Sequence, residues 1–262
     1  MRKPLRLGLL FFVLVGIGTM EAVSIADEVS DPPQFAFRIF PQTLPAKGVS
    51  VRMSLKGWYR DGEGKPVGAL RSLRFEGDRQ ISLHLDGVPE CQGLASDVRR
   101  DLDEMEELCG DAAIGRGRLT FEAFFPGDRW IRFSEKMTVY NLGPKSRGAD
   151  LLAFAYFPAP VTTALGIPIE IRRLNRGPFG WEARASIPKI AGGYGRITEY
   201  SLKIDKRFLS ATCRGGKLEM RVVSGFFDRA RRKERATRRC SVPKLSSYAQ
   251  VASSFPQSSS SR

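Results

Sequence analysis

The sequence of 262 residues contains a single histidine, His84, and lacks the motifs that most hydrolases use. A Ser-His-Asp triad needs a histidine held between a nucleophile and a carboxylate. Neither a GxSxG nucleophile elbow nor an HExxH metalloprotease motif is present. His84 falls at the polar phase of the alternating run Leu83-His84-Leu85, which indicates a histidine at the surface or at a sheet edge. We therefore predict no catalytic constellation, and a protein that is not an enzyme.

Long apolar runs and clustered metal ligands are also missing. Beyond the N-terminus no run reaches 18 apolar residues, which argues against a chain that crosses a membrane several times. The cysteines form no CxxC knuckle, so a zinc site is not expected, and no calcium-loop signature occurs. The glycine-rich stretches 115–117 and 192–195 precede strand patterns and not helices, which excludes a nucleotide-binding loop. We expect no metal and no cofactor.

The chain begins with a segment that resembles an export signal. Three basic residues precede the 14-residue apolar stretch Leu7–Met20, and small residues stand at Ser24 and Ala26. This arrangement is typical of a secretory signal peptide over residues 1–26. The apolar stretch is short for a bilayer, which needs about 20 residues, although an uncleaved anchor is the alternative. The sequence thus predicts a protein that is secreted or held in the cell envelope.

The chain is basic and contains enough apolar residues to fold. Its net charge is +14 and 42% of its residues are hydrophobic, which excludes a disordered protein. Removal of residues 1–26 would leave 236 residues with a net charge of +12, so the basic character belongs to the folded part. Residues 27–245 show no linker or internal repeat and predict a single β domain. Residues 246–262 contain eight serines and predict a disordered tail.

From Phe35 onward, apolar and polar residues alternate in short runs that turn signals separate. A period of two places successive side chains on opposite faces of a β-strand. The alternation is present at residues 49–55, 81–85, 119–124, 132–140, 167–172, 181–187, 197–204 and 218–223. Glycine, proline and aspartate cluster between these runs at hairpin-like spacing. We predict a mainly β fold of about 11–12 strands, either an antiparallel β-sandwich or an open, curved barrel.

All four cysteines, Cys91, Cys109, Cys213 and Cys240, follow the predicted signal peptide. An even number of cysteines in an exported chain indicates two disulfides. Of the three possible pairings, the local one, Cys91–Cys109 with Cys213–Cys240, needs no long-range coincidence and is preferred. Each closed loop would stabilise the fold by about 3 kcal/mol through the unfolded chain.

One segment between Cys91 and Cys109 has a helical period. Its apolar residues recur at intervals of three or four, at Leu94, Val98, Leu102, Met105 and Leu108. Ser96 or Asp97 could cap the start of a helix, and Gly110 lies just past its end. We predict one short amphipathic helix, pinned against the sheet at both ends by the first disulfide.

Two short motifs surround the cysteines. One runs Gly87-Val88-Pro89-Glu90-Cys91, a helical spacer, Cys109-Gly110-Asp111-Ala112, and then Ile114-Gly115-Arg116-Gly117 at the start of a strand. The other is Ile187-Pro188-Lys189-Ile190-Ala191-Gly192-Gly193-Tyr194-Gly195, followed by a strand and by Cys213 and Cys240. Over residues 35–241 the chain resembles a family of uncharacterised exported proteins of actinobacteria. The resemblance implies an exported all-β domain with two local disulfides, and it implies no activity and no functional residue.

The most unusual feature is a basic run, Asp228–Arg239, near the C-terminus. Its seven basic residues are Arg229, Arg231, Arg232, Lys233, Arg235, Arg238 and Arg239. Guanidinium groups bind phosphates in a bidentate manner, and the preceding Phe226 and Phe227 could stack on a ligand. We predict an anion-binding loop for an anionic polymer or an anionic membrane surface, without sequence-specific recognition of nucleic acid. The alternative is a solvated hairpin loop closed by Cys213–Cys240.

Two other classes of function stay open beside this exported, non-enzymatic binding domain. The apolar run Leu151–Phe157 could line a pocket for an apolar or lipid ligand in a curved sheet, or it could be a core strand buried on both faces. Glu170 and Glu182 lie on neighbouring predicted strands. Two carboxyl groups about 5–9 Å apart could act there as the acid and base of a glycoside hydrolase.

Overall fold

The computed structural model describes the strand-rich part of the chain. The described residues are 34–45, 47–92, 101–127, 129–158 and 162–241, and all fall within a single structural unit. The signal peptide predicted over residues 1–26 and the tail predicted over residues 246–262 lie outside them.

Fourteen strands account for most of the described residues, and every predicted alternating run falls wholly or mainly within a strand. The strands are β1 (Phe35–Phe40), β2 (Val49–Ser50), β3 (Arg52–Trp58), β4 (Leu70–Asp78), β5 (Ile81–Leu83), β6 (Ala113–Phe125), β7 (Arg129–Lys145), β8 (Gly148–Phe157), β9 (Thr163–Arg173), β10 (Phe179–Ser186), β11 (Gly195–Ile204), β12 (Leu209–Ala211), β13 (Lys217–Phe226) and β14 (Arg231–Arg239). The helical elements are α1 (Leu102–Cys109), η1 (Gly110–Ala112), η2 (Ala191–Gly193) and η3 (Lys206–Phe208).

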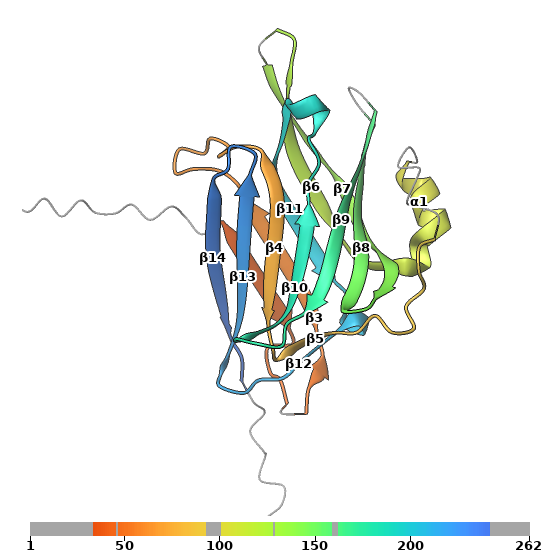
Figure 1. Ribbon diagram of the computed structural model, residues 1–262, viewed down its shortest axis with the longest axis vertical. Coiled ribbons are helices and arrows are strands. Elements are labelled where there is room, and N and C mark those ends of the chain that lie inside the picture. Colours follow the sequence, from red (N-terminus) through yellow and green to blue (C-terminus); the bar gives the residue numbers. More distant parts are fainter. Residues whose placement is uncertain (1–33, 46, 93–100, 128, 159–161, 242–262) are drawn as a thin grey trace, which may run out of the picture. The chain divides into compact units, whose positions relative to one another are not determined.

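Eleven of the strands form one antiparallel sheet that curves into a nearly closed barrel (Figure 1). Their order is β1-β3-β11-β6-β7-β8-β9-β10-β4-β13-β14. Strands β2, β12 and β5 form a small second sheet, at the lower end of the barrel in Figure 1. Of the two predicted architectures, the curved barrel is confirmed, because the main strands continue around one sheet and do not divide into two.

The barrel closes at a seam, which is the boundary between β1 and β14. Ten antiparallel steps separate these two strands, so they run parallel and cannot continue the antiparallel ladder. A single isolated parallel bridge, between Thr43 and Ser241, is formed there by the described residues. The backbone therefore leaves most of the seam without a ladder of hydrogen bonds.

Side chains of β14 complete the seam. The backbone N–H of Gln34 donates to Glu234 Oε2 at 2.8 Å. Four residues further along β14, Arg238 Nε donates to the backbone carbonyl of Phe37 at 2.5 Å. A carboxylate and a guanidinium thus replace part of the missing backbone pairing.

Alternation along the strands gives the barrel an apolar inner face and a polar outer face. On the inner face two aromatic rings lie across glycines of neighbouring strands, Tyr200 over Gly57 and Trp181 over Gly77. A Cβ atom at either glycine would collide with the ring, so only glycine fits beside these rings. The Trp181 indole N–H donates to the Ile81 carbonyl at 3.1 Å and is therefore satisfied.

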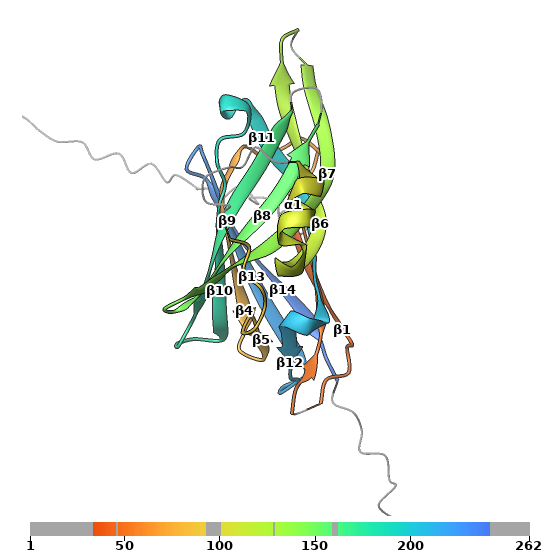
Figure 2. The ribbon, with the colours of Figure 1, turned by 90° about the vertical axis from the view of Figure 1, so that its right-hand side faces the viewer.

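Helix α1 covers the outer side of the wall beside β7 and β8 (Figure 2). Met105 and Cys109 pack there against Tyr140, Leu152 and Phe154 in a second cluster of buried side chains. Strand β8 is consequently buried on both faces, which confirms one of the two interpretations of its apolar run.

The predicted helix is confirmed, but it begins later than predicted. Its N-cap is Asp101, whose side chain accepts the Glu104 N–H at 2.9 Å, while the Glu104 side chain accepts the Asp101 N–H. A reciprocal capping box thus starts α1 at Asp101, and the predicted caps Ser96 and Asp97 lie outside the described residues. Leu108, predicted on the apolar stripe, is 47% exposed. Two other stripe residues, Leu94 and Val98, lie outside the described residues.

Both disulfides have the predicted local pairing, Cys91–Cys109 and Cys213–Cys240. Cys109 is the last residue of α1. The first disulfide therefore fixes one end of the helix and not both. The second joins the two chain segments at the open end of the β13–β14 hairpin.

Candidate functional site: a cationic face on the barrel wall

The predicted basic loop is instead strand β14. Six of its seven basic residues lie within the strand, and Arg229 lies in the preceding turn. β14 pairs along its whole length with β13. The outer face of β14 meets solvent, and its inner face lies at the seam, where Glu234 and Arg238 bind the backbone of the opposite segment. Because both faces carry polar side chains, the strand shows no alternation of apolar and polar residues. Because its residues are mostly charged and do not alternate with apolar ones, the sequence did not predict β14 as a strand.

Strand geometry separates the basic residues of β14 into two groups. Arg232 and Arg238 share a face with Glu234, toward the seam, where Arg238 binds the Phe37 carbonyl. The opposite, outward face carries four cations, which are Arg231, Lys233, Arg235 and Arg239. The structure thus brings four of the seven predicted anion-binding residues to one surface.

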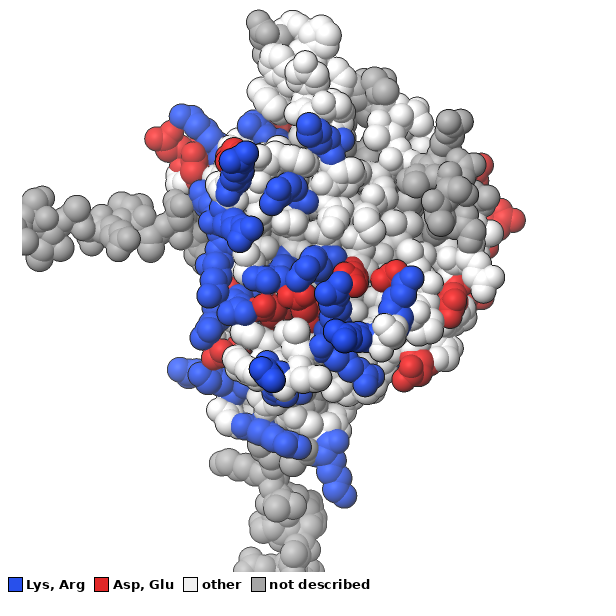
Figure 3. All heavy atoms as spheres, viewed as in Figure 1, with Lys and Arg blue, Asp and Glu red and all other residues white. Residues whose placement is uncertain are grey.

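These four residues belong to a larger surface, the cationic face, which we define as the outward side chains of β14, β13, β4 and β10. It appears as the mainly blue area on the left of Figure 3. The register places Arg235 beside Arg221 on β13. On β4 and β10, Arg74 lies opposite Arg184. The basic members are Arg74, Arg184, Lys217, Arg221, Arg231, Lys233, Arg235 and Arg239.

The basic residues on β4, β10 and β13 were not predicted as site residues. Each is a polar member of an alternating strand, which is ordinary for a solvated face. Only the register between strands that are distant in the sequence shows that Arg74, Arg184 and Arg221 are neighbours. No motif in the sequence connects these three arginines.

Two buried carboxylates, Glu76 and Glu182, form the centre of the cationic face. They stand opposite each other on β4 and β10, with exposures of 5% and 6%. Arg184 Nη2 lies 2.8 Å from Glu182, and Arg221 Nε donates to Glu76. Arg74 lies between them, 3.8 Å from Glu76 and 3.7 Å from Glu182. The carboxylates therefore hold three arginines in fixed positions, and the hydrogen bond to Glu76 raises the pKa of Arg221.

The two carboxylates of the predicted pair, Glu170 and Glu182, lie on the neighbouring strands β9 and β10 as predicted. Glu182 stands opposite Arg172 on β9 and opposite Glu76 on β4. Glu170 stands opposite Arg184 and accepts a hydrogen bond from Arg172 at 2.7 Å. The two predicted residues are thus offset by two positions in the register, and arginines bind both.

Several outward cations of β14 are open to an external anion. Arg235 Nη1 lies 3.6 Å from Glu219 on β13. Arg231, Lys233 and Arg239 form no ion pair with any residue that the structure describes. All four cations are exposed. The face therefore has two parts. At its centre the carboxylates hold arginines in fixed positions, and at its edge the cations of β14 remain accessible to an external anion.

A second polar region, which we call the outer groove, lies on the other side of the seam, over β1, β3 and β11. Its volume is about 730 Å³. It is lined by Ala36, Arg38, Ser54, Lys56, Trp58, Arg60, Arg132, Thr198 and Glu199. A bulge in β11 at Thr198 lies in its wall.

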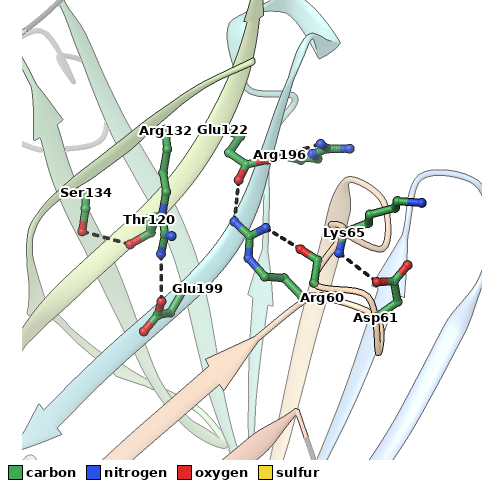
Figure 4. A network of polar contacts seen from close by, with 10 residues as sticks. Arg60, Asp61, Lys65, Thr120, Glu122, Arg132, Ser134, Arg196 and Glu199 are labelled. Atoms are coloured by element: carbon green, nitrogen blue, oxygen red, sulfur yellow. Dashed lines mark hydrogen bonds and ion pairs between the residues drawn. The ribbon is translucent and has the colours of Figure 1, made fainter. Parts of the chain in front are cut away.

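Most cations of the outer groove are already paired (Figure 4). Glu199 binds Lys56 at 3.1 Å and Arg132 at 3.2 Å. Arg60 binds Glu122 at 2.5 Å. Internal neutralisation makes the groove a weaker candidate for binding an external anion than the cationic face.

The barrel encloses an apolar cavity of about 100 Å³. Leu151 and Ala153 of β8 line it, together with Trp181, Ala183 and Ala185 on β10. β8 therefore contributes alternate residues to the cavity and to the contact with α1. An unfilled cavity of this size costs about 2 kcal/mol of folding free energy.

His84 is exposed and follows β5, as the sequence predicts for a surface histidine. Its Nε2 lies 2.7 Å from the Ser210 hydroxyl, and its backbone N–H donates to the Phe208 carbonyl. No carboxylate in the described ranges hydrogen-bonds to its other ring nitrogen. The Ser–His pair therefore lacks the third member of a triad.

Four further findings bear on the function. Within the described ranges, no three histidine, cysteine or acidic side chains gather in a way that could hold a metal. No helix in the same ranges is long and apolar enough to cross a membrane. The two disulfides are consistent with an oxidising, extracellular environment. Comparison of the chain with protein-family models, curated proteins and solved structures finds no match.

Proposed function

We propose that this protein is an exported, non-enzymatic binding protein whose cationic face binds a polymer that carries phosphate groups. The observation that supports this most is the continuity of the cations, from the outward residues of β14 to the arginines of β13, β4 and β10. A guanidinium group binds a phosphate through two parallel N–H donors. Each guanidinium–phosphate contact is weak by itself, but several of them on one polymer chain together raise the affinity of the polymer for the face.

The sheet spaces these cations regularly. Outward residues two positions apart on a strand are separated by about 6.8 Å, and neighbouring strands by about 4.8 Å. Arg231, Lys233 and Arg235 thus form one row, and Arg221 begins the next. A flexible polyanion can place its phosphates on such a lattice in several registers. Recognition would therefore depend on charge spacing and not on the order of monomers.

The composition of the face favours a polymer over a membrane surface. Proteins that lie on lipid surfaces usually insert apolar side chains beside their basic groups. The large exposed hydrophobic side chains of the described chain are Phe40, Leu108, Trp130, Tyr194 and Phe227, and none lies on β4, β10, β13 or β14. Phe227 borders the face, and the Lys189 ammonium lies over its ring at 5.9 Å.

The test is the binding of fluorescently labelled inorganic polyphosphate, measured by anisotropy between 50 and 300 mM salt. The variant replaces four outward cations of β14 by glutamine, at Arg231, Lys233, Arg235 and Arg239. We expect binding at 100 mM salt to weaken by about tenfold or more, and the slope of log affinity against log salt to fall by about three, since each neutralised phosphate contributes about 0.7–0.9.

A matched control removes the same number of charges from another part of the wall. It replaces the exposed outward residues of β6, β7 and β11 by glutamine, at Arg116, Arg118, Lys136 and Lys203. This control should bind polyphosphate within about twofold of the unchanged protein. An equal loss in both variants would show that net charge alone governs binding. Tighter binding to vesicles of anionic lipid than to polyphosphate would show that a membrane surface is the partner.

Export is the second part of the proposal. The disulfides and the signal-like segment over residues 1–26 support it. Outside a cell, teichoic-acid-like polymers and released nucleic acid offer phosphate backbones at high density. The mass of the protein recovered from the culture medium tests this part, because cleavage after Ala26 leaves 236 residues. Retention of the full chain inside the cell would overturn it.

A further inference from the structure

A pocket lies across the seam at the end where β14 finishes. We call it the seam pocket and define it by Arg38 and Phe40 on β1, Gln42 just after β1, and Arg238 and Arg239 on β14. Its volume is about 360 Å³, within the range of about 300–1,000 Å³ that is usual for ligand sites. It is thus large enough for the end residue of a polymer.

The lining of the seam pocket contains three arginines and no carboxylate. Arg38, Arg238 and Arg239 form no ion pair with any other residue in the described ranges, and all three are exposed. In the outer groove, by contrast, Glu199 binds two of the cations. Like charges that share a pocket without a counter-charge repel one another, and a bound anion removes this repulsion. The lining therefore favours an anion.

Hydrogen bonds hold the two sides of the seam pocket together. The Leu44 N–H donates to the Ser241 carbonyl at 2.8 Å, and the Ser241 N–H donates to the Gln42 carbonyl at 3.3 Å. Arg238 Nε donates to the Phe37 carbonyl at 2.5 Å. This bond fixes the guanidinium group and leaves both of its Nη atoms to donate to a ligand. Donors that are positioned in advance lower the entropic cost of binding.

The seam pocket continues the row of cations on β14. Arg231, Lys233 and Arg235 precede it on the outward face, and Arg239 belongs both to the cationic face and to the pocket. β14 reaches this end at the bottom of Figure 1. A polymer that lies along β14 therefore extends toward the pocket, where Arg38 adds a cation from the other side of the seam.

We propose that the seam pocket binds the terminal phosphate monoester of a polymer that lies on the cationic face. This inference rests on the proposed function and assigns the end of the same polymer. A terminal monoester has a charge of about −1.5 to −2 at neutral pH, more than an internal diester, and three oxygens that accept hydrogen bonds. Three guanidinium groups match this charge and these acceptors. Phe40, which is 49% exposed, shields one side of the pocket from water and strengthens the ionic contacts.

The test compares three thymidine oligomers that carry fluorescein at the 3′ end, by anisotropy at pH 8 and 100 mM salt. The first has about ten nucleotides and a 5′-hydroxyl, and the second has the same length and a 5′-phosphate. The third is two nucleotides longer with a 5′-hydroxyl, so that it gains about the same charge as the 5′-phosphate supplies. The second should bind about tenfold more tightly than the first, and the third no more than about twofold more tightly.

Two variants locate the end site. Arg38→Gln removes one guanidinium group of the seam pocket and leaves the cationic face unchanged. The preference for the 5′-phosphate should fall from about tenfold to about threefold or less, while the affinity for the first oligomer stays within about twofold. Arg231→Gln is the matched control at the other end of the row. It should weaken the binding of all three oligomers to a similar extent and keep the preference.

The comparison of the second and third oligomers needs no variant. Equal, salt-sensitive binding of these two to the unchanged protein would overturn the end site and leave the proposed function intact. An undiminished preference in Arg38→Gln, with circular dichroism showing an intact fold, would also overturn it. If none of the three oligomers binds, the end site is excluded, and the binding of polyphosphate decides separately whether the proposed function holds.

Discussion

Strands β8 and β14 both lack the alternation that marks most strands of this barrel, for opposite reasons. β8 faces the apolar cavity on one side and α1 on the other, so both of its faces are apolar. β14 has solvent on its outer side and the seam on its inner side, so both of its faces carry charge. The position of a strand in the wall, and not its strand propensity, decides which side chains it can carry.

Because their surroundings differ, β8 and β14 contribute to the protein in different ways. β8 contributes packing, through side chains such as Phe154, which is completely buried. β14 contributes little packing and presents cations to solvent, while Glu234 and Arg238 close the seam. Stability and binding should therefore respond to substitutions in different strands.

The sharpest test of this comparison is a pair of alanine substitutions. Phe154→Ala in β8 should lower the free energy of unfolding by about 3–5 kcal/mol, because it opens a cavity beneath α1. Lys233→Ala in β14 should change it by no more than about 0.5 kcal/mol, as for an ordinary surface position. Urea unfolding measures both values. Similar losses in the two variants would show that β14 carries packing of its own.

A smaller effect is expected at the carboxylates of the cationic face. Glu76→Gln should lower the free energy of unfolding by about 1–2 kcal/mol, because Glu76 is buried and binds Arg221. It should also strengthen polyphosphate binding by about two- to fivefold at low salt, because the arginines lose a competing anion.

Glu122 provides the matched control for Glu76. It is 8% exposed and also binds two arginines, Arg60 and Arg196, but it lies on β6, outside the cationic face. Glu122→Gln should lower stability by a similar amount and leave polyphosphate affinity unchanged. A gain in affinity in both variants would contradict the assignment of binding to the cationic face.

The smallest expected effect is a change in pH dependence at the seam. Burial raises the pKa of Glu234 above its ordinary value of 4.5, so the folded chain holds this proton more tightly than the unfolded chain. The contribution of Glu234 to stability therefore falls as the pH rises from 4.5 through the raised pKa. Glu234→Gln should remove this fall and gain stability relative to the unchanged protein as the pH rises.

Urea unfolding at a series of pH values between 4 and 8 measures this difference. Glu63→Gln, in an exposed turn, is the control and should keep the pH dependence of the unchanged protein. Parallel stability curves for the unchanged protein and Glu234→Gln would show that the seam carboxylate is fully solvated.

Much of the fold follows from the sequence. The runs of alternating residues all correspond to strands, and the four cysteines pair locally as predicted. The choice between sandwich and barrel did not follow, because it depends on whether the last strand returns to the first. The start of α1 was misplaced because Ser96 and Asp97 are good capping residues, but only Asp101 has a glutamate three residues later to complete the box.

The candidate site followed from the sequence only in part. The basic run correctly indicated the segment that contributes to the candidate site. Its interpretation as a loop, however, assigned anion binding to all seven basic side chains. Alternation on β14 sends Arg232 and Arg238 to the seam, and the register adds Arg74, Arg184 and Arg221 from strands far away in the chain.

The seam also sets the order in which this chain can fold. Gln34 and Glu234, which meet there, are 200 positions apart, whereas β6 to β10 follow one another as neighbours. Contacts between distant segments form slowly because a long loop must close first. The β6–β10 meander can therefore form early, while β1 and β3 wait for β11 and β14. A nascent chain of this topology stays open until its final strand is available, which would suit passage through a secretion channel before folding.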